Sequence, residues 1–143
     1  MPKVSLQDLS SSDARFLLEL QRLIEEGESP GTVQLARRLG VRPPTVSEVL
    51  KRLEGKGMVR RTGWGRFELT ARGRRAAETL LHNHRVIESY FVIAFGLDVE
   101  YACREASKIG HLVGERVVAS MCRSLNWPDR CVHGKEVIHW SCR

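Results

Sequence analysis

The chain has 143 residues, of which 42% are hydrophobic, so it can form one compact unit or two small units that share a core. Its composition argues against wholesale disorder, and no apolar run is long enough to span a bilayer. The N-terminal sequence MPKVSLQDLS lacks the apolar core of a signal peptide. We therefore expect a cytoplasmic protein without a membrane partner, whose four cysteines are thiols or metal ligands rather than disulfides.

The net charge of +6 is unevenly distributed along the chain. Residues 1–75 hold 15 Lys and Arg against 9 Asp and Glu, whereas residues 76–143 hold 8 of each. The stretch 37–75 alone holds 12 basic residues against three acidic ones. A basic half joined to a neutral half predicts a polyanion-binding module fused to a second element. A basic face that serves only solubility is the alternative.

The first predicted helix covers residues 13–26. Ser11 or Ser12 is its expected N-cap, and Gly27 is expected to end it. The helical spacing comes from Phe16, Leu17, Leu20, Leu23 and Ile24.

Two short helices follow. The first is predicted from Val33 to Leu39, with Thr32 as its cap, Gly40 as its end and an inward face of Val33, Leu35, Ala36 and Leu39. The second is predicted over 44–55, because prolines are tolerated only in the first turn of a helix. Its buried face is expected to be Val46, Val49, Leu50 and Leu53.

A two-stranded ribbon comes next, with strands near 58–61 and 66–69 and a turn at 63–65. Trp64 stands at the tip of this turn, and we expect it to pack against the protein rather than to contact DNA. Two short helices with a tight turn between them, then a ribbon with a basic tip, form a winged helix-turn-helix.

The second half is predicted to be helical. Thr70 is expected to cap a long helix over 71–95, and Asp98 a second helix over 99–124. The tail, 126–143, shows no clear periodicity. The fold class is therefore mainly α.

The helix over 44–55 is the predicted reader of the DNA major groove. Glu48 can accept a hydrogen bond from a cytosine amino group, and Pro44 or the Thr45 methyl group can pack on a thymine methyl. Ser47 shares that face. The side chains suited to phosphates or the minor groove are Arg42, Lys51, Arg52, Arg60, Arg61 and Arg66. A winged helix used only for protein contacts is the alternative.

Potential metal ligands gather in the neutral half. His84 and Glu88 are four residues apart, which places them on one helix face, and Cys103, Ser107 and His111 repeat this spacing. The tail adds Cys131 and His133, and then His139 and Cys142; the remaining candidates are His82 and Cys122, and we interpret Cys122 as a core residue. Each pair alone is weak evidence. Together, thiolates, imidazoles and one carboxylate suit zinc, ferrous iron, cobalt or nickel better than magnesium or calcium.

Four stretches carry a resemblance to a known family: PGTVQLARRLGVRPPTVSEVLKRLEGKGMV, LTARGRRAAETLLHNHRVIESYF, GLDVEYACREASKIGH and PDRCVHG. In order and spacing, residues 32–134 resemble the diphtheria toxin repressor and manganese transport regulator family of metal-dependent regulators. The resemblance implies a winged helix-turn-helix domain over 1–75 and a helical dimerisation and metal-binding domain with an irregular tail over 76–143. It also implies a short form that lacks the SH3-like domain of larger members.

The resemblance assigns metal ligands position by position. The family's His and Glu at the start of the long helix match His84 and Glu88, and a further ligand, usually His, falls on Cys103. The Cys and His of a C-P-H-G segment, which bind metal in manganese-sensing members, match Cys131 and His133.

The resemblance also implies a second, primary metal site, but most of its ligand positions hold other residues in this chain. Its N-terminal ligand, Asp or Met, falls on Arg15, and its helix ligands fall on Ser107, Gly110 and His111. Only His111 keeps a ligand type, and an arginine repels a cation. We therefore expect this primary site not to form, with Arg15 standing in for the charge of the metal.

The sequence thus predicts a homodimeric, metal-responsive DNA-binding repressor, not an enzyme, whose 76–125 helices form the dimer interface. Two recognition helices would read half-sites of a palindromic operator about one helical turn apart. One metal per subunit is expected on His84, Glu88, Cys103, Cys131 and His133, or on four of these. We expect zinc in preference to ferrous iron, with manganese as a further candidate.

Two alternatives keep the same fold. Cys103, Cys131 and Cys142 could form a thiol redox switch or hold an iron–sulfur cluster. A permanent DNA-binding dimer with purely structural zinc is the other alternative.

Overall fold

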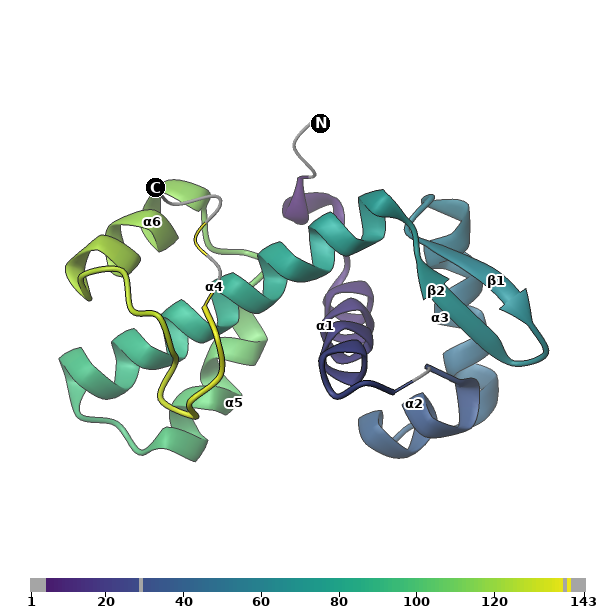
Figure 1. Ribbon diagram of the computed structural model, residues 1–143, viewed down its shortest axis with the longest axis horizontal. Helices are drawn as coiled ribbons and strands as arrows, with labels where there is room; N and C mark the ends of the chain where they lie inside the picture. Colours follow the sequence, from purple (N-terminus) through teal and green to yellow (C-terminus); the bar gives the residue numbers. More distant parts are fainter. Residues whose placement is uncertain (1–4, 29, 138, 140–143) are drawn as a thin grey trace. The chain divides into compact units, whose positions relative to one another are not determined.

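The computed structural model describes residues 5–28, 30–137 and 139. Within them the chain forms six α-helices, one short 3₁₀ turn and a two-stranded sheet, so the expected mainly helical class is confirmed (Figure 1). The chain divides into two compact units, Met1–Glu78 and Thr79–Arg143, and helix α4 (Ala71–Phe95) has residues in both. Among the described residues, no helix combines the length and apolar character that a membrane span requires.

Helix α1 (Ser11–Glu25) opens the first unit, and its N-cap is Ser10 rather than the expected Ser11 or Ser12. The reason is a capping box: the Asp13 backbone N–H donates to the Ser10 hydroxyl at 3.0 Å, and the Ser10 N–H donates back to the Asp13 carboxylate at 3.3 Å. The buried face of α1 includes Phe16, Leu17, Leu20 and Leu23.

Helices α2 (Thr32–Leu39) and α3 (Pro43–Gly55) complete the helix-turn-helix. Gly40 ends α2 in the left-handed conformation at φ 66°, as expected of a glycine that closes a helix. Thr32 is the first residue of α2 and not its cap, which is Gly31. The expected inward position of Val33 is wrong, since this side chain is 65% exposed and the buried residues of α2 are Leu35, Ala36 and Leu39.

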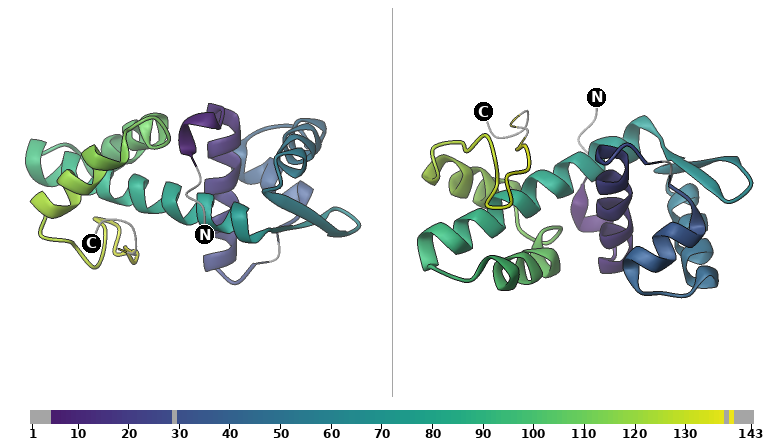
Figure 2. Two further views of the ribbon diagram at one scale, coloured as in Figure 1. Left: turned by 90° about the horizontal axis from the view of Figure 1, so that it is seen from above. Right: turned by 60° about the horizontal axis from the view of Figure 1, so that its bottom comes forward.

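Strands β1 (Val59–Gly63) and β2 (Arg66–Leu69) pair antiparallel and form the wing. Figure 2 shows the hairpin at the side of the unit; its buried residues are Val59, Phe67 and Leu69, and the Gly65 carbonyl in its turn accepts from the Thr32 N–H at the start of α2 at 3.1 Å. Trp64 at this tip is fully exposed, so the expectation that it packs against the protein is wrong. The turn of the hairpin contacts the start of α2 through the backbone of Gly65, while the Trp64 side chain stays in solvent.

Helix α4 is joined closely to the base of the wing. Its cap is Thr70, as expected: the Gly73 N–H donates to the Thr70 hydroxyl at 3.0 Å, and that hydroxyl donates to the Gly57 carbonyl at 2.6 Å. A Cβ atom on Gly73 would lie 1.8 Å from the Met58 carbonyl oxygen, so only glycine allows this approach. The first turn of α4 is therefore fixed against Gly57 and Met58, which connect α3 to β1.

The second unit contains the rest of α4 and two further helices, α5 (Val99–Ile109) and α6 (Glu115–Ser124). Asp98 caps α5, as expected, but the single helix expected over 99–124 is wrong. The chain leaves the helix after Gly110 and re-enters it after Gly114, which has extended backbone and is the N-cap of α6. Gly110 and Gly114 are four positions apart, and glycine is a poor helix former, so the helix is weakened at this point.

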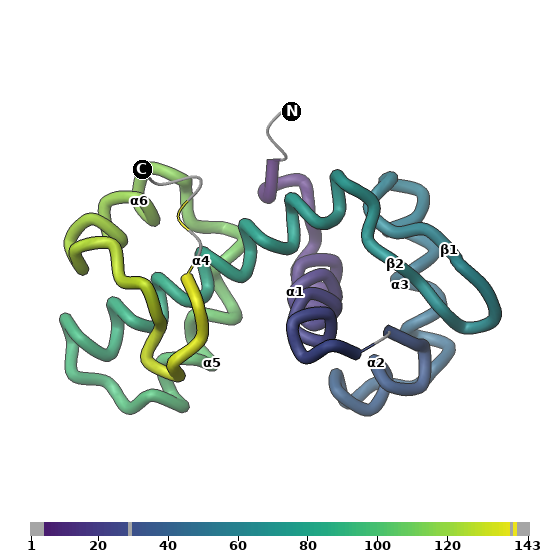
Figure 3. Tube along the Cα trace, viewed as in Figure 1, coloured from purple at the N-terminus to yellow at the C-terminus, as the bar shows by residue number. Residues whose placement is uncertain are grey.

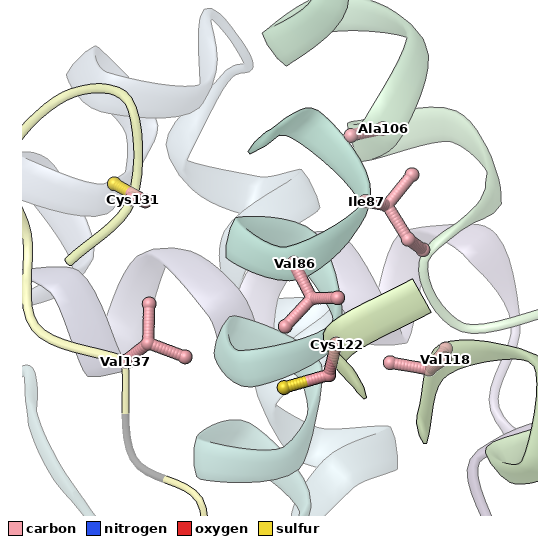
Figure 4. Packing of buried hydrophobic residues seen from close by; sticks show 7 residues of the cluster. All are labelled: Val86, Ile87, Ala106, Val118, Cys122, Cys131 and Val137. Carbon is pink, nitrogen blue, oxygen red and sulfur yellow. The ribbon is translucent and has the colours of Figure 1, made fainter. Parts of the chain in front are cut away.

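After α6 the chain returns as an irregular segment along α4, shown in yellow in Figure 3. An isolated bridge joins Arg130 to Glu136, and the Arg85 guanidinium donates to the Glu136 carbonyl at 2.7 Å. The core of the unit lies between α4, α5, α6 and this segment (Figure 4); its members are Val86, Ile87, Ala106, Val118, Cys122, Cys131 and Val137.

One buried carboxylate joins α1 to α3 in the first unit. Asp13 is fully buried, and its two oxygens accept from Arg52 at 2.8 Å and Lys56 at 2.6 Å. Burial alone would raise the pKa of this carboxyl, but the hydrogen bonds from Lys56, Arg52 and Ser10 outweigh it and hold the pKa below the ordinary value of 3.8. The ionised form of Asp13 therefore stabilises the winged unit.

Replacing Asp13 by Asn should lower the free energy of unfolding by about 2 kcal/mol at neutral pH, because Arg52 and Lys56 lose a buried counter-ion. Since the folded-state pKa is depressed, this stabilisation is complete above the unfolded pKa of 3.8 and is lost as pH falls through the folded pKa. Urea unfolding of both proteins from pH 7 to pH 3 measures the difference. The exposed carboxylate Asp8 offers the control, D8N, and an equal effect of the two variants would contradict the role of Asp13.

Candidate metal centre and DNA-binding surface

Helix α3 has one buried face and one open face. Val46, Val49, Leu50 and Leu53 are buried, as expected. All ten residues that the sequence assigns to DNA are exposed, namely Arg42, Pro44, Thr45, Ser47, Glu48, Lys51, Arg52, Arg60, Arg61 and Arg66. The helix thus presents short polar side chains at its N-terminal end, where a helix in the major groove meets base edges.

Several of the basic side chains already have partners inside the unit. Arg52 pairs with Asp13, Arg60 pairs with Glu68, and the Arg61 guanidinium lies 5.5 Å from the centre of the Phe67 ring. Within the described part of the chain, no ion pair engages Lys51 or Arg42. Lys51 is therefore the most direct probe of a phosphate contact, because its replacement breaks no internal pair.

Helix α4 supplies the first two members of the candidate metal centre. His84 and Glu88 are one turn apart on a buried face, and His84 Nε2 lies 3.3 Å from Glu88 Oε2. Cys103 reaches the same place from α5, with its Sγ 3.5 Å from His84 Nε2. The repeated four-residue spacing of the sequence thus corresponds to two facing helices.

The irregular segment after α6 supplies the other two members. His133 Nδ1 lies 3.3 Å from either oxygen of Glu88, and the buried Cys131 also contacts Glu88. Two triads result, His84–Glu88–Cys103 and Glu88–Cys131–His133, and the donor atoms of each lie within 4.8 Å of one another. The structure therefore brings all five predicted ligands around one carboxylate.

Glu88 is the electrostatic centre of this group. Only 1% of its surface is exposed. Burial alone would raise the pKa of its carboxyl, but His84, Cys131 and His133 outweigh that effect and lower the pKa to about 2. Among the described residues, none gives the buried Oε2 a hydrogen bond of good geometry, although two imidazoles lie 3.3 Å away. An ionised, buried oxygen in this position fits a cation better than it fits the imidazoles alone.

The thiols fit the same group. Burial, and after it the charge of Glu88, raises the pKa of Cys131, so a metal ion must displace a proton from this thiol. Two thiols, two imidazoles and one carboxylate form a donor set for zinc or ferrous iron, whereas magnesium, calcium and manganese favour oxygen ligands. The residues present therefore fit a thiophilic divalent metal.

The positions of the other family site have different contacts. In the first unit, Arg15 donates to the Leu39 carbonyl at 2.7 Å and so binds the end of α2. In the second unit, the Ser107 hydroxyl donates to the Cys103 carbonyl at 2.9 Å, and His111 is buried. The failure of this site to form, and a charge-replacing role for Arg15, stay predictions.

The sequence missed one cluster. His82, Cys122 and His139 also place three donor atoms within 4.8 Å of one another. Cys122 is a core residue, as expected, but it faces two imidazoles as well. No local spacing relates the tail to α6, so only the three-dimensional fold reveals this group. Cys142 lies outside the described residues.

Two protein-family models match the chain. Residues 8–63 match the model described as iron dependent repressor, N-terminal DNA binding domain. Residues 70–139 match the model described as iron dependent repressor, metal binding and dimerisation domain. The gap between the two matches lies just before α4, and together the matches include residues of both compact units.

Individual relatives agree with these models. The chain is 32% identical over 132 residues to the iron-dependent repressor IdeR of Mycobacterium leprae, covering 92% of this chain and 57% of the relative. It is 35% identical over 96 residues to the transcriptional regulator MntR of Escherichia coli, covering 67% and 61%. A crystal structure of ScaR with bound Zn²⁺ is similar with a TM-score of 0.74 at 26% identity, covering 87% and 58%. The chain spans less than two thirds of the length of each.

Replacing Glu88 by Gln should remove one tightly bound zinc ion per chain, because the amide keeps the size of the side chain but not its charge. Competition with a chromophoric chelator measures the stoichiometry. The neighbouring buried residue Ser89 provides the matched control S89A, since its hydroxyl makes no hydrogen bond within the described part of the chain. Equal zinc binding by E88Q and the wild-type chain would show that Glu88 is not a ligand.

Proposed function

Because this chain belongs to the family of iron-dependent repressors, we propose that it is a metal-responsive repressor that binds a palindromic operator as a homodimer. The family consists of transcriptional regulators, so the chain is not an enzyme, as expected. The observation that carries the proposal is the buried, ionised Glu88 among two imidazoles and two thiols, on a helix whose first turns belong to the DNA-binding unit.

The metal proposed is zinc, with ferrous iron as the second candidate. Two thiol ligands favour these ions over manganese, and ScaR, a structurally similar regulator, has been crystallised with Zn²⁺. His84, Glu88, Cys103, Cys131 and His133, or four of them, would hold the ion. When bound, it would supply positive charge next to a buried carboxylate.

The DNA contacts proposed are those of a winged helix. The exposed residues Thr45, Ser47 and Glu48 would meet base edges, with Pro44 packing on a thymine methyl. The basic residues of α3 and the wing would contact phosphates, and Arg60 and Arg61 would exchange their internal partners for them.

Self-association is supported by apolar side chains on the surface of the second unit. Five large ones are exposed there: Ile93, Phe95, Tyr101, Leu112 and Val117. Burial of these side chains against a second copy of the chain would remove apolar surface from water, and it would place two recognition helices in two-fold symmetry. A two-fold dimer reads a palindrome with half-sites about one helical turn apart.

Metal and DNA would be coupled through α4. The first turn of this helix is fixed to Met58 at the base of the wing, and His84 and Glu88 lie farther along the same helix. Metal binding that joins α4 to α5 and the segment after α6 would favour one arrangement of the recognition helices over others. Bound zinc would then raise the affinity for the operator, and the free energy of coupling between the metal site and the DNA site would set the size of the increase.

Removal of zinc should weaken binding to an operator duplex, selected by the chain from random sequences, on the order of 10-fold. Fluorescence anisotropy before and after chelation measures this change. E88Q should show the weaker affinity with or without zinc, and S89A should behave as the wild-type chain. Operator binding that persists after chelation with the dimer intact would favour a structural zinc, and a visible chromophore in the purified protein would favour an iron–sulfur cluster.

Replacing Lys51 by Ala should weaken binding to every duplex alike and reduce the slope of log affinity against log salt by about 1, because one phosphate contact is lost. K108A removes the same charge from α5 and is the control for net charge. An unchanged salt slope for K51A would contradict the phosphate contact.

A further inference from the structure

Three side chains far apart in the sequence meet on another side of α4. His82 comes from this helix, Cys122 from α6 and His139 from the end of the described tail. His82 and Cys122 are buried, and Cys122 Sγ lies 3.2 Å from His139 Nδ1. The rings of His82 and His139 meet edge to face with their centres 5.8 Å apart.

This cluster is separate from the Glu88 group and shares no residue with it. His82 and His84 are two residues apart, which is a rotation of about 200° around the axis of an α-helix, so their side chains leave it on nearly opposite sides. Cys122 belongs to the core packed on that side of α4, beside Val86 and Val118 (Figure 4). Helix α4 therefore carries one group of ligand atoms on each of two faces.

Hydrogen bonds fix which nitrogen of each imidazole can bind a metal. His139 Nε2 lies 2.6 Å from the Pro128 carbonyl oxygen, which can only accept, so Nε2 carries the proton and donates. Nδ1, which faces the Cys122 thiol, then carries the lone pair of the ring. A ligand histidine that donates its other N–H to a backbone carbonyl is the arrangement usual around protein-bound metals.

His82 is oriented in the same manner. Its Nδ1 lies 3.2 Å from Asn83 Oδ1, and the Asn83 amide nitrogen donates to the Gly110 carbonyl at 3.4 Å, which places the oxygen of the amide toward the imidazole. His82 Nδ1 therefore donates, and Nε2 holds its electron pair. Both imidazoles are thus set in the tautomer that a metal requires.

We propose that His82, Cys122 and His139 form a second metal site, which takes zinc. Two imidazoles and one thiolate suit Zn²⁺, and they exclude hard cations such as magnesium and calcium. Zinc held there would join α6 and the tail to α4. The same stretch of chain carries Cys131 and His133, so this ion would also order the segment that completes the Glu88 group.

Cobalt binding to a chain with one thiol tests the site directly. In C103S/C131S/C142S the remaining cysteine is Cys122, and the Glu88 group has lost both thiols. Addition of Co²⁺ should give a thiolate-to-cobalt charge-transfer band, and H82Q or H139Q in this background should abolish it. A folded one-thiol protein that shows no such band would overturn the proposal, whatever the fate of the proposed repressor function.

Zinc stoichiometry in the otherwise native chain gives a second, independent test. The wild-type chain and S89A should bind two zinc ions per chain, and H139Q and E88Q should each bind one. In E88Q the remaining ion should survive further replacement of His133 but not of His82. Zinc stoichiometry that is the same in H139Q and the wild-type chain, with circular dichroism showing both folded, would overturn the second site.

Discussion

A charge buried in the second unit is the constraint on which its arrangement depends. The Glu88 side chain is almost completely buried, yet the pKa of its carboxyl is held at about 2, so the carboxyl is ionised at every physiological pH. A buried carboxylate is costly unless opposite charge or hydrogen-bond donors surround it. His84 from the same helix and His133 from the segment after α6 meet this need in part. A divalent ion shared with Cys103 and Cys131 would meet it fully, so folding of this segment and metal binding support each other.

Helix α4 is the element through which this constraint can reach DNA. Its first turn has no room for a side chain at Gly73, because the Met58 carbonyl lies there, and Thr70 joins the same turn to Gly57. Later turns carry His84 and Glu88 on one face and His82 on another. Residues of α4 belong to both units, so whatever binds its later turns acts on the same helix that begins at the base of the wing. The chain belongs to the family of iron-dependent repressors, and the proposed function uses this helix as the link between metal and DNA.

The sequence predicted the winged unit well because its signals are local. Gly40, the prolines at the start of α3 and the cap at Thr70 each act within one turn of chain. The i, i+4 spacing likewise identified His84 with Glu88. Prediction from the sequence failed at positions where burial and long-range contacts decide the structure. Trp64 is apolar, but its side chain is fully exposed. The break between α5 and α6 depends on glycines whose effect a run of helix-forming residues obscured. His139 meets Cys122 only because the tail folds back, which no periodicity encodes.

In the proposed function, metal binding at Glu88 and operator binding are energetically coupled, and coupling of this kind is reciprocal. The most direct measurement is the zinc affinity of the full chain with and without saturating operator duplex, by competition with a chelator. Operator should raise the affinity for the zinc ion that E88Q loses, by the same factor by which this zinc ion raises the affinity for the operator. Equal zinc affinities in the presence and absence of operator would contradict it.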